Sequence, residues 1–514
     1  MKKNILILSL LLFVVIGFAQ KKSKFDFEME VFIKNYPADS TLKLGRYYQG
    51  KTYFVDTFTF DKKNKSFVLR RDTVPDSGMY MLISYENVPH DVIIDHDHHF
   101  TVRTEYKNIE GKDAHYFDGS TFENSLDNQL FLNFNLNTAS FRKEMDSLRM
   151  VYTDIQQKEK DLDTNSAAYA ALKIRKQNIT DGFDILNAKL ETLKDNFLKD
   201  NPEHIMTVVF KAQKEIDVPD APDSITDDIA KQRWRWEYYY NHYFDNIDLH
   251  DARLVRTPIY PQKLQNYIEK ILPPHPDTIK FALERLIEKT RGCDEIFKYT
   301  VWYPIDYYQR SPVVGYDAIW VYLAKKYYLP KKEGDTLADA FWATPGMISN
   351  LKNRIEKVEP LLIGNVPPEF YCPDTNVDRP NQKMISCFAP AKNHRYTVVM
   401  FWEPSCSHCR KKIPELRDLY NAKKDELDFE VYAVGKDHNV GEWKEYIYKN
   451  NIDKWINVNG KTSNINFDDR WDIISTPTLY VLDNKHRIVT KRIEPEQIEP
   501  FIKMWNEEYY KLVK

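Results

Sequence analysis

The stretch VVMFWEPSCSHCRKKIPEL, residues 398–416, decides the fold of the C-terminal part of this chain. Its apolar run into Trp402 is typical of a buried strand, and the residues that follow have helical spacing. Cys406 and Cys409 fall where the strand gives way to the helix. The free N–H groups and the dipole of a helix N-terminus favour an anion. We therefore expect a stabilised, reactive thiolate at Cys406.

Cys409 lies one helical turn beyond Cys406 on the same face, where it can close a disulfide with it. Zinc would need two further ligands, and the chain has no second CxxC motif. Haem attachment would need a histidine after the second cysteine, and Arg410 stands there instead. A redox pair is therefore favoured over a metal site or two inert thiols, and no metal or other cofactor is expected.

A second motif, IISTPTLYVLD at residues 473–483, places Thr476-Pro477 just before an apolar strand. An X-Pro bond is where a cis peptide costs least, and proline at a strand start removes a ladder donor. The two motifs, with Pro414 five residues after Cys409, together resemble the thioredoxin fold. The closest resemblance is to its exported TlpA/ResA-like branch, a group of thiol–disulfide oxidoreductases related to the AhpC/TSA proteins. It covers about residues 361–514, and the earlier regions more weakly resemble domains of unknown function in Bacteroidota envelope proteins.

The resemblance implies a part for each matched residue. Cys406 would be the nucleophile that attacks a substrate disulfide, and Cys409 would resolve the mixed disulfide. Pro477, if cis, would lie against the pair and exclude metals. The backbone of Thr476 would then pair with an extended substrate strand. Trp402 would pack beside the motif, although an ordinary core aromatic has the same pattern.

Two positions depart from the family pattern. Thioredoxin carries a buried acid six residues before the first cysteine, and Met400 stands there; the TlpA/ResA branch often carries glutamate three residues after the second, and Lys412 stands there. Glu403 and Asp437 are candidate substitutes for the missing proton acceptor, with solvated surface carboxylates as the alternative. The site is also electropositive, which lowers a thiol pKa and favours the reduced form. The cations are His408, Arg410, Lys411 and Lys412. The family implies a reductase, whereas stabilisation of the reduced form shifts the reduction potential in the oxidising direction. The redox direction therefore stays open.

The N-terminus reads as an export signal. Met1-Lys2-Lys3 precedes an apolar run from Ile5 to Phe18, and Gly17-Phe18-Ala19 supplies a small-residue cleavage signal before Gln20. A retained anchor helix is the alternative, but the run is short for a span. We therefore expect a signal peptide at 1–19 and a mature chain without a transmembrane span in the periplasm or cell envelope, where disulfides persist.

Length and periodicity divide the remainder into three domains. A chain of 514 residues is too long to fold around a single hydrophobic core. The near balance of 73 Lys and Arg against 76 Asp and Glu argues against a nucleic-acid partner. Short alternating runs predict an antiparallel β-sandwich at 20–122. Helical spacing predicts an all-α domain at 123–360. Strands then alternate with helices, which predicts an α/β thioredoxin fold at 361–514.

Three other features have mostly structural interpretations. IIDHDHHF, residues 93–100, could bind a transition metal, but a solvated turn between two strands is favoured. Cys372 and Cys387 could bridge a hairpin, which sequence alone cannot establish. RWRWEYYYNHYFDN, residues 233–246, resembles a ligand groove, but an aromatic helix in a large core is the default.

Two hypotheses of function follow. The first is an envelope oxidoreductase that exchanges disulfides with protein substrates and with an unknown redox partner. The second is a non-catalytic binding or scaffolding protein with a degenerate thioredoxin module. The intact motifs favour the first, and the missing acid keeps the second open.

Overall fold

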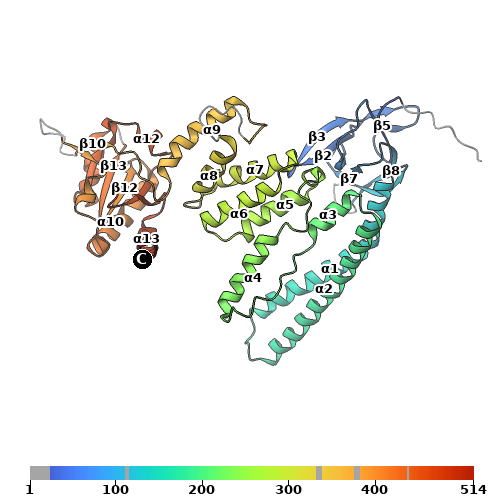
Figure 1. The fold of residues 1–514 in the computed structure, drawn as a ribbon, viewed down its shortest axis with the longest axis horizontal. Helices are drawn as coiled ribbons and strands as arrows, with labels where there is room; N and C mark the ends of the chain where they lie inside the picture. Colours follow the sequence, from blue (N-terminus) through green and yellow to red (C-terminus); the bar gives the residue numbers. More distant parts are fainter. Residues whose placement is uncertain (1–23, 110–114, 331–338, 375–382, 437–438, 514) are drawn as a thin grey trace, which may run out of the picture. The chain divides into compact units, whose positions relative to one another are not determined.

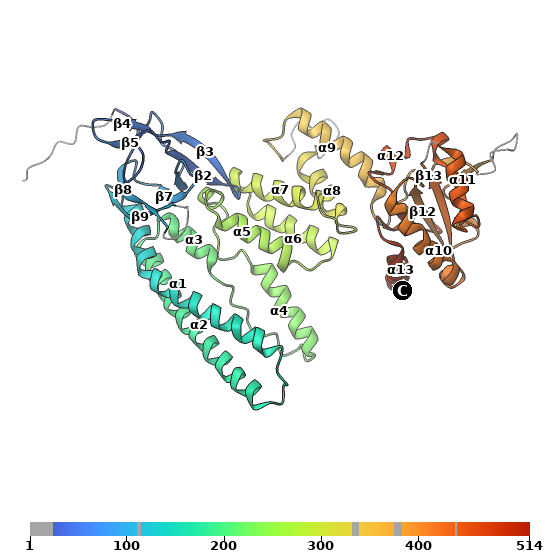
Figure 2. The same cartoon turned by 180° about the vertical axis from the view of Figure 1, so that it is seen from behind.

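A computed structural model describes residues 24–109, 115–330, 339–374, 383–436 and 439–513 (Figures 1 and 2). The expected signal peptide at 1–19 lies outside these residues. The described chain divides into two compact units. The first runs to Asp217 and adds 244–248 and 253–263; the second holds 218–243, 249–252 and everything from Leu264. No described helix has the length and hydropathy that crossing a membrane requires.

The first unit begins with two facing sheets. Their strands are β1 Phe27–Lys34, β2 Lys43–Tyr48, β3 Lys51–Thr57, β4 Thr59–Asp61, β5 Ser66–Arg71, β6 Gly78–Ile83, β7 Pro89–Ile94, β8 His99–Asn108 and β9 His115–Glu123. One sheet has the order β4-β5-β1-β8-β9, and the other has β3-β2-β6-β7. Alternate residues Phe27, Met29 and Val31 are fully buried between them. The predicted sandwich is confirmed, with one departure: β1 pairs with β8 in parallel.

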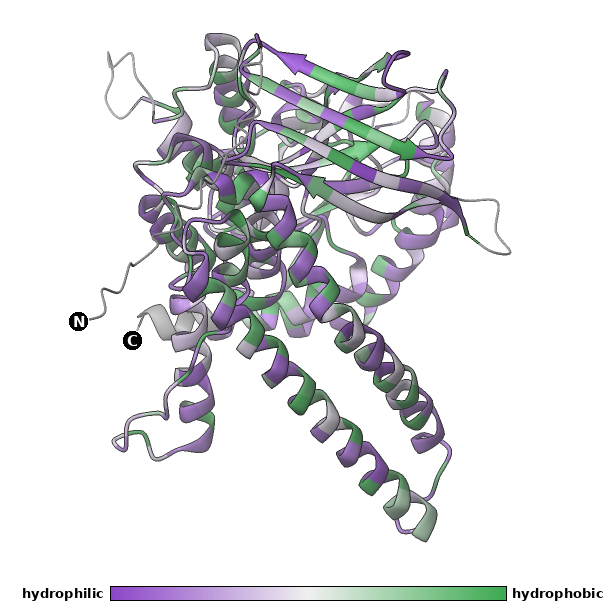
Figure 3. Cartoon of the chain, turned by 90° about the vertical axis from the view of Figure 1, so that its right-hand side faces the viewer, coloured by the Kyte–Doolittle hydropathy of each residue, from purple (hydrophilic) through white to green (hydrophobic). Residues whose placement is uncertain are grey.

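A long helical hairpin follows the sheets. It consists of α1 (Leu126–Glu159) and α2 (Ala167–Asp200), and polar and apolar residues alternate along both helices (Figure 3). Ser125 caps α1 by accepting the Asn128 N–H. The Asn128 side chain exchanges two 2.8 Å hydrogen bonds with the backbone N–H and C=O of Ile93 in β7. The start of the hairpin is therefore fastened to the second sheet by one buried amide.

The predicted helical middle is confirmed. Its remaining α-helices are α3 Ile205–Gln213, α4 Asp228–His242, α5 Ile259–Asn266, α6 Pro276–Lys289, α7 Asp294–Gln309, α8 Asp317–Tyr328 and α9 Pro345–Val358. In α4, the default expectation of a core helix is wrong, because none of its residues is buried. Its aromatic rings stack along the helix instead, with Trp234 against Tyr238 and Tyr238 against His242. The expectation holds only for the end of the same aromatic stretch, where Tyr243 and Phe244 follow the helix and are buried.

The C-terminal part is the predicted α/β domain. Its sheet has the order β14-β13-β12-β15-β16, with β12 at the centre. The strands are β12 Tyr396–Trp402, β13 Phe429–Gly435, β14 Ile456–Asn459, β15 Thr478–Asp483 and β16 Ile488–Lys491. The other elements are the hairpin β10 Tyr371–Pro373 and β11 Met384–Ser386, and the helices α10 Ser407–Leu427, α11 Val440–Lys449, α12 Phe467–Arg470 and α13 Ile498–Val513.

Side chains alternate across the central strand and build two cores. Val398, Met400 and Trp402 face a cluster with residues of α10, α11 and α13. Val399 and Phe401 face the opposite cluster, with residues of the β10–β11 hairpin and α12. Helices and hairpin thus cover both faces of the sheet, and all seven residues of β12 are buried.

Ion pairs join α8 and α9 to this domain. Asp472 accepts hydrogen bonds of 2.8 and 3.2 Å from Arg354 of α9 and also pairs with Arg492. The buried Lys491 ammonium contacts Asp317 of α8 and the carbonyl of Leu361. Burial alone would raise the pKa of Asp472, but the hydrogen bonds and charges of the two arginines outweigh it and lower the pKa.

We predict that Asn128→Ala loosens the junction between α1 and β7. The change leaves both backbone groups of Ile93 without these side-chain partners, at a cost of about 2–4 kcal/mol. Hydrogen–deuterium exchange of peptides that contain Ile93 should accelerate, whereas exchange in β12 should not change. Unaltered exchange at Ile93 would contradict the assignment.

We predict that Asp472→Asn lowers the thermal midpoint at pH 7. The change should reduce the free energy of unfolding by about 1–2 kcal/mol, after allowance for solvent screening. A lowered carboxyl pKa contributes stability that is complete above the ordinary value of 3.8 and is lost as pH falls through the lowered pKa. The gap between wild type and variant should therefore narrow in scans taken below pH 3.8. A constant gap would mean that packing, not the ion pairs, carries the difference.

Candidate active site

The loop after β12 positions Cys406. The cysteine is the N-cap residue of α10, and its backbone N–H donates to the carbonyl of Glu403 over 3.3 Å. Its own carbonyl accepts the first helical hydrogen bond, from Arg410 N–H. The Arg410 guanidinium also donates to the carbonyl of Pro404 over 2.8 Å, which closes the loop onto the helix. Cys406 is therefore held at the helix N-terminus by its flanking residues.

The second motif lies directly against this thiol. The Thr476-Pro477 peptide bond is cis, and the Cys406 thiol donates to the carbonyl of Thr476 over 3.1 Å. The Thr476 hydroxyl donates to a carboxylate oxygen of Glu403 over 2.8 Å. The two loops are thus joined by one hydrogen bond from the thiol and one from the hydroxyl.

The two thiols have opposite environments. For Cys406, burial acts to raise the pKa, but hydrogen bonds from the backbone of Cys409, from Thr476 and from the backbone of His408 outweigh it and lower the pKa. Cys409 is fully buried, and this burial raises its pKa to about 12. The accessible thiol can therefore ionise readily, whereas the inner thiol needs help to lose its proton.

The two supporting residues, Trp402 and His408, have opposite degrees of burial. Trp402 is fully buried in the same cluster as Cys409, and its ring lies 5.4 Å from that of Tyr446. His408 is exposed on the first turn of α10. Its backbone N–H acts on Cys406, so its effect on the thiol is that of the helix terminus.

Neither usual acid position supplies a proton acceptor. Met400 is buried in the core beside Cys409. The Lys412 ammonium lies 2.8 Å from Glu415, 2.9 Å from Glu494 and 3.7 Å from Glu496. Of the candidate substitutes, Asp437 lies outside the described residues.

The structure places Glu403 at the site through a contact with Thr476 that the sequence did not predict. The hydrogen bond from Thr476 that holds it joins residues 73 positions apart. Tyr446 of α11 was missed as well. The only sequence signal for Glu403 is an acid directly after a fully buried strand.

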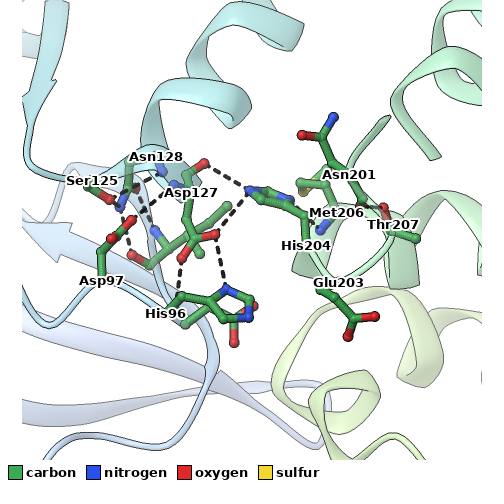
Figure 4. Close-up of polar contacts among 12 residues, drawn as sticks. His96, Asp97, Ser125, Asp127, Asn128, Asn201, Glu203, His204, Met206 and Thr207 are labelled. Carbon is green, nitrogen blue, oxygen red and sulfur yellow. Dashed lines mark hydrogen bonds and ion pairs between the residues drawn. The ribbon is translucent and has the colours of Figure 1, made fainter. Parts of the chain in front are cut away.

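The histidine-rich turn lies between β7 and β8, as predicted, and Figure 4 shows what it contacts. Among the described residues, Asp95, His96 and Asp127 are close enough to share an ion. However, Asp95 pairs with Arg253 at 3.2 Å, and Asp127 accepts the His96 backbone N–H at 2.8 Å. His99 is the first residue of β8, and the ring of His98 contacts the carbonyl of Asp95. The expected solvation is wrong for Asp95, which is buried, and the contact between His96 and Asp127 fastens the turn to α1.

Cys372 and Cys387 form no disulfide in this structure. Cys372 and Cys387 are both fully buried on the core side of the β10–β11 hairpin. They are free thiols, and burial raises the pKa of each. At α4, for which a ligand groove was the alternative to a core helix, there is an open depression with Arg235, Trp236 and Tyr239 in its wall.

Comparison with known proteins gives matches to two parts of the chain. A family model described as Thioredoxin-like matches residues 393–488, which contain both motifs. A model described as a domain of unknown function, DUF5106, matches residues 189–313. No curated protein matches.

Several solved structures are similar. A domain of a possible thiol-disulfide isomerase from Cytophaga hutchinsonii is 29% identical, covers 30% of this chain and 98% of its own, and has a TM-score of 0.27. A thioredoxin-like protein from Bacteroides caccae is 20% identical over 57% of this chain and 99% of its own, with a TM-score of 0.42. A thiol-disulfide oxidoreductase from Bacteroides fragilis is 21% identical over 27% and 98%, with a TM-score of 0.24. The C-terminal domain of this chain is thioredoxin-like.

Proposed function

We propose that this chain is an exported thiol–disulfide oxidoreductase that exchanges disulfides with protein substrates through Cys406 and Cys409. The observation that carries the proposal is the asymmetry of the pair. Cys406 is partly exposed at a helix N-terminus with a lowered pKa, and Cys409 is buried with a raised one. A nucleophile must ionise at ambient pH, and a resolving thiol must be shielded from competing reactions.

The chemistry is two successive exchanges. The Cys406 thiolate attacks one sulfur of a substrate disulfide, and the other substrate sulfur leaves as a thiolate. The Cys409 thiolate then attacks the Cys406 sulfur, which releases the second substrate sulfur and forms the Cys406–Cys409 disulfide. The substrate gains two electrons and the pair loses them. The same steps in reverse oxidise a substrate dithiol.

Protein substrates are supported by the surroundings of the thiol. The backbone of the Thr476-Pro477 loop lies beside Cys406, and an extended peptide can pair with such a backbone. Ile474, which precedes Thr476 in the same loop, is 79% exposed and offers an apolar contact to a substrate. Export rests on the basic and apolar N-terminal segment.

We predict that Cys406 is alkylated at least tenfold faster than Cys409 by iodoacetamide at pH 6. Only the thiolate reacts, and a lowered pKa keeps the Cys406 thiolate populated at acidic pH, whereas the raised pKa keeps Cys409 protonated. Peptide mass spectrometry over a time course gives both rates. The Cys406→Ser variant controls for reactivity that Cys409 gains once its partner is blocked. Equal rates would remove the nucleophile assignment.

We predict that Cys409→Ser accumulates mixed disulfides with other proteins, because the resolving thiol is gone. Non-reducing electrophoresis after acid quenching, with and without dithiothreitol, detects them as bands of high mass. The double variant Cys406→Ser, Cys409→Ser is the matched control. If both variants give the same bands, the scaffolding hypothesis replaces the enzyme.

A further inference from the structure

We propose that Glu403, acting through the hydroxyl of Thr476, receives the proton of the Cys409 thiol. The inference deepens the proposed function and rests on it, because the proton moves in the resolving step. The inference supplies a proton acceptor for Cys409, which the two usual acid positions lack. Met400 is apolar, and Lys412 forms ion pairs with glutamates.

The contacts of Glu403 place it at the junction of the two loops that meet at the thiol pair. Its carbonyl accepts the Cys406 N–H, and its backbone acts to lower the pKa of Cys409. Its carboxylate accepts the Thr476 hydroxyl over 2.8 Å. The side chain is neither buried nor fully exposed, and its carboxylate reaches the Thr476 loop.

The Thr476 hydroxyl connects this carboxylate to the inner thiol. A hydroxyl has one donor and two acceptor positions. Its donor position is taken by Glu403. The Thr476 loop lies against the thiol pair, because its carbonyl accepts the Cys406 thiol over 3.1 Å, and the Thr476 side chain acts to lower the pKa of Cys409. The hydroxyl oxygen that donates to the carboxylate can still accept a proton from the pair.

The proton transfer balances without any further group. The Cys409 S–H gives its proton to Thr476 Oγ1 while the hydroxyl proton moves to the Glu403 carboxylate. The products are a Cys409 thiolate that accepts the Thr476 O–H and a neutral Glu403 carboxyl. The thiolate attacks the Cys406 sulfur, the substrate sulfur leaves with the bonding electrons, and Glu403 returns its proton to that thiolate or to water.

Other titratable groups face the pair but cannot take this proton. Tyr446 of α11 lies near Cys409, and burial raises its pKa, so it stays neutral at physiological pH. Arg410 of α10 is a permanent cation whose guanidinium is bonded to Pro404. Cys406 is bonded to the substrate at this stage. Glu403 is the described carboxylate that remains in contact.

Glu403→Gln separates a proton acceptor from a structural tie. The glutamine amide oxygen can still accept the Thr476 hydroxyl, so the two loops stay joined, but it cannot take up a proton. A tie alone would therefore survive the change. Thr476→Val removes the hydroxyl without changing charge, and Thr476→Ser restores it. Glu415→Gln makes the same charge change on α10 without contact to Thr476.

The experiment uses the full chain and an aromatic disulfide reagent that releases a coloured thiolate. Cys406 releases the first thiolate, and Cys409 releases the second when it resolves the mixed disulfide. At pH 7 we expect the second release to slow about 10- to 100-fold in Glu403→Gln and in Thr476→Val, with the first unchanged. The deficit should shrink as pH rises toward the range in which an unassisted thiol ionises. Thr476→Ser should recover part of the rate, and Glu415→Gln should match wild type.

The outcomes are distinguishable. The proposal is overturned if the rate of the second release in Glu403→Gln equals that of wild type at every pH. It is also overturned if both releases slow equally, because that result indicates that Glu403 only holds the two loops together. Absence of any second release from wild type defeats the oxidoreductase itself. Signal from other cysteines is subtracted with Cys406→Ser. If circular dichroism shows that Glu403→Gln is misfolded, the Thr476→Val and Thr476→Ser pair decides the question.

Discussion

The buried strand β12 is the constraint on which the site depends. It pairs with β13 in parallel on one side and with β15 in antiparallel on the other, where Phe401 lies opposite Thr478. Because β12 ends where β15 begins, the loop that leaves one strand and the loop that enters the other meet at one edge of the sheet. Cys406 and Thr476 become neighbours through this register, although 70 residues separate them. The hydrogen bonds between the loops hold a contact that the sheet has already formed.

The electrostatics around α10 show why an acid does not stand at the position of Lys412. Three glutamates surround this lysine, and the hydrogen bonds that its ammonium donates to Glu415 and Glu494 raise its pKa. A carboxylate in its place would join them and be repelled, so the cation suits its neighbours. The position at which the resemblance implied an acid thus contributes to surface charge pairing here. A different carboxylate, that of Glu403, is left in contact with the loop that contains the cis-proline.

The sequence predicted what local pattern determines. The β12 strand, the α10 helix and the place of Cys406 at its start follow from apolar runs and helix-terminus chemistry within one short stretch. The parallel pairing of β1 with β8 did not follow, because alternation is the same in parallel and antiparallel strands. Helix α4 was wrongly placed in a core, because aromatic residues can bury area against one another on an open helix. The contact between Glu403 and Thr476 could not be predicted from the sequence, since it exists only after the sheet has formed.

The parallel pairing of β1 with β8 also determines the order in which the N-terminal sheets can form. A ribosome makes the chain from its N-terminus, so β1 exists long before β8, which starts only at His99. Closing a long loop costs entropy before any contact rewards it, and such non-local pairing slows folding. Met29 and Val31, fully buried in the finished protein, are left half-covered in the nascent chain. The sheet that contains β1 is therefore complete only after the last two strands of this domain, β8 and β9, have been made.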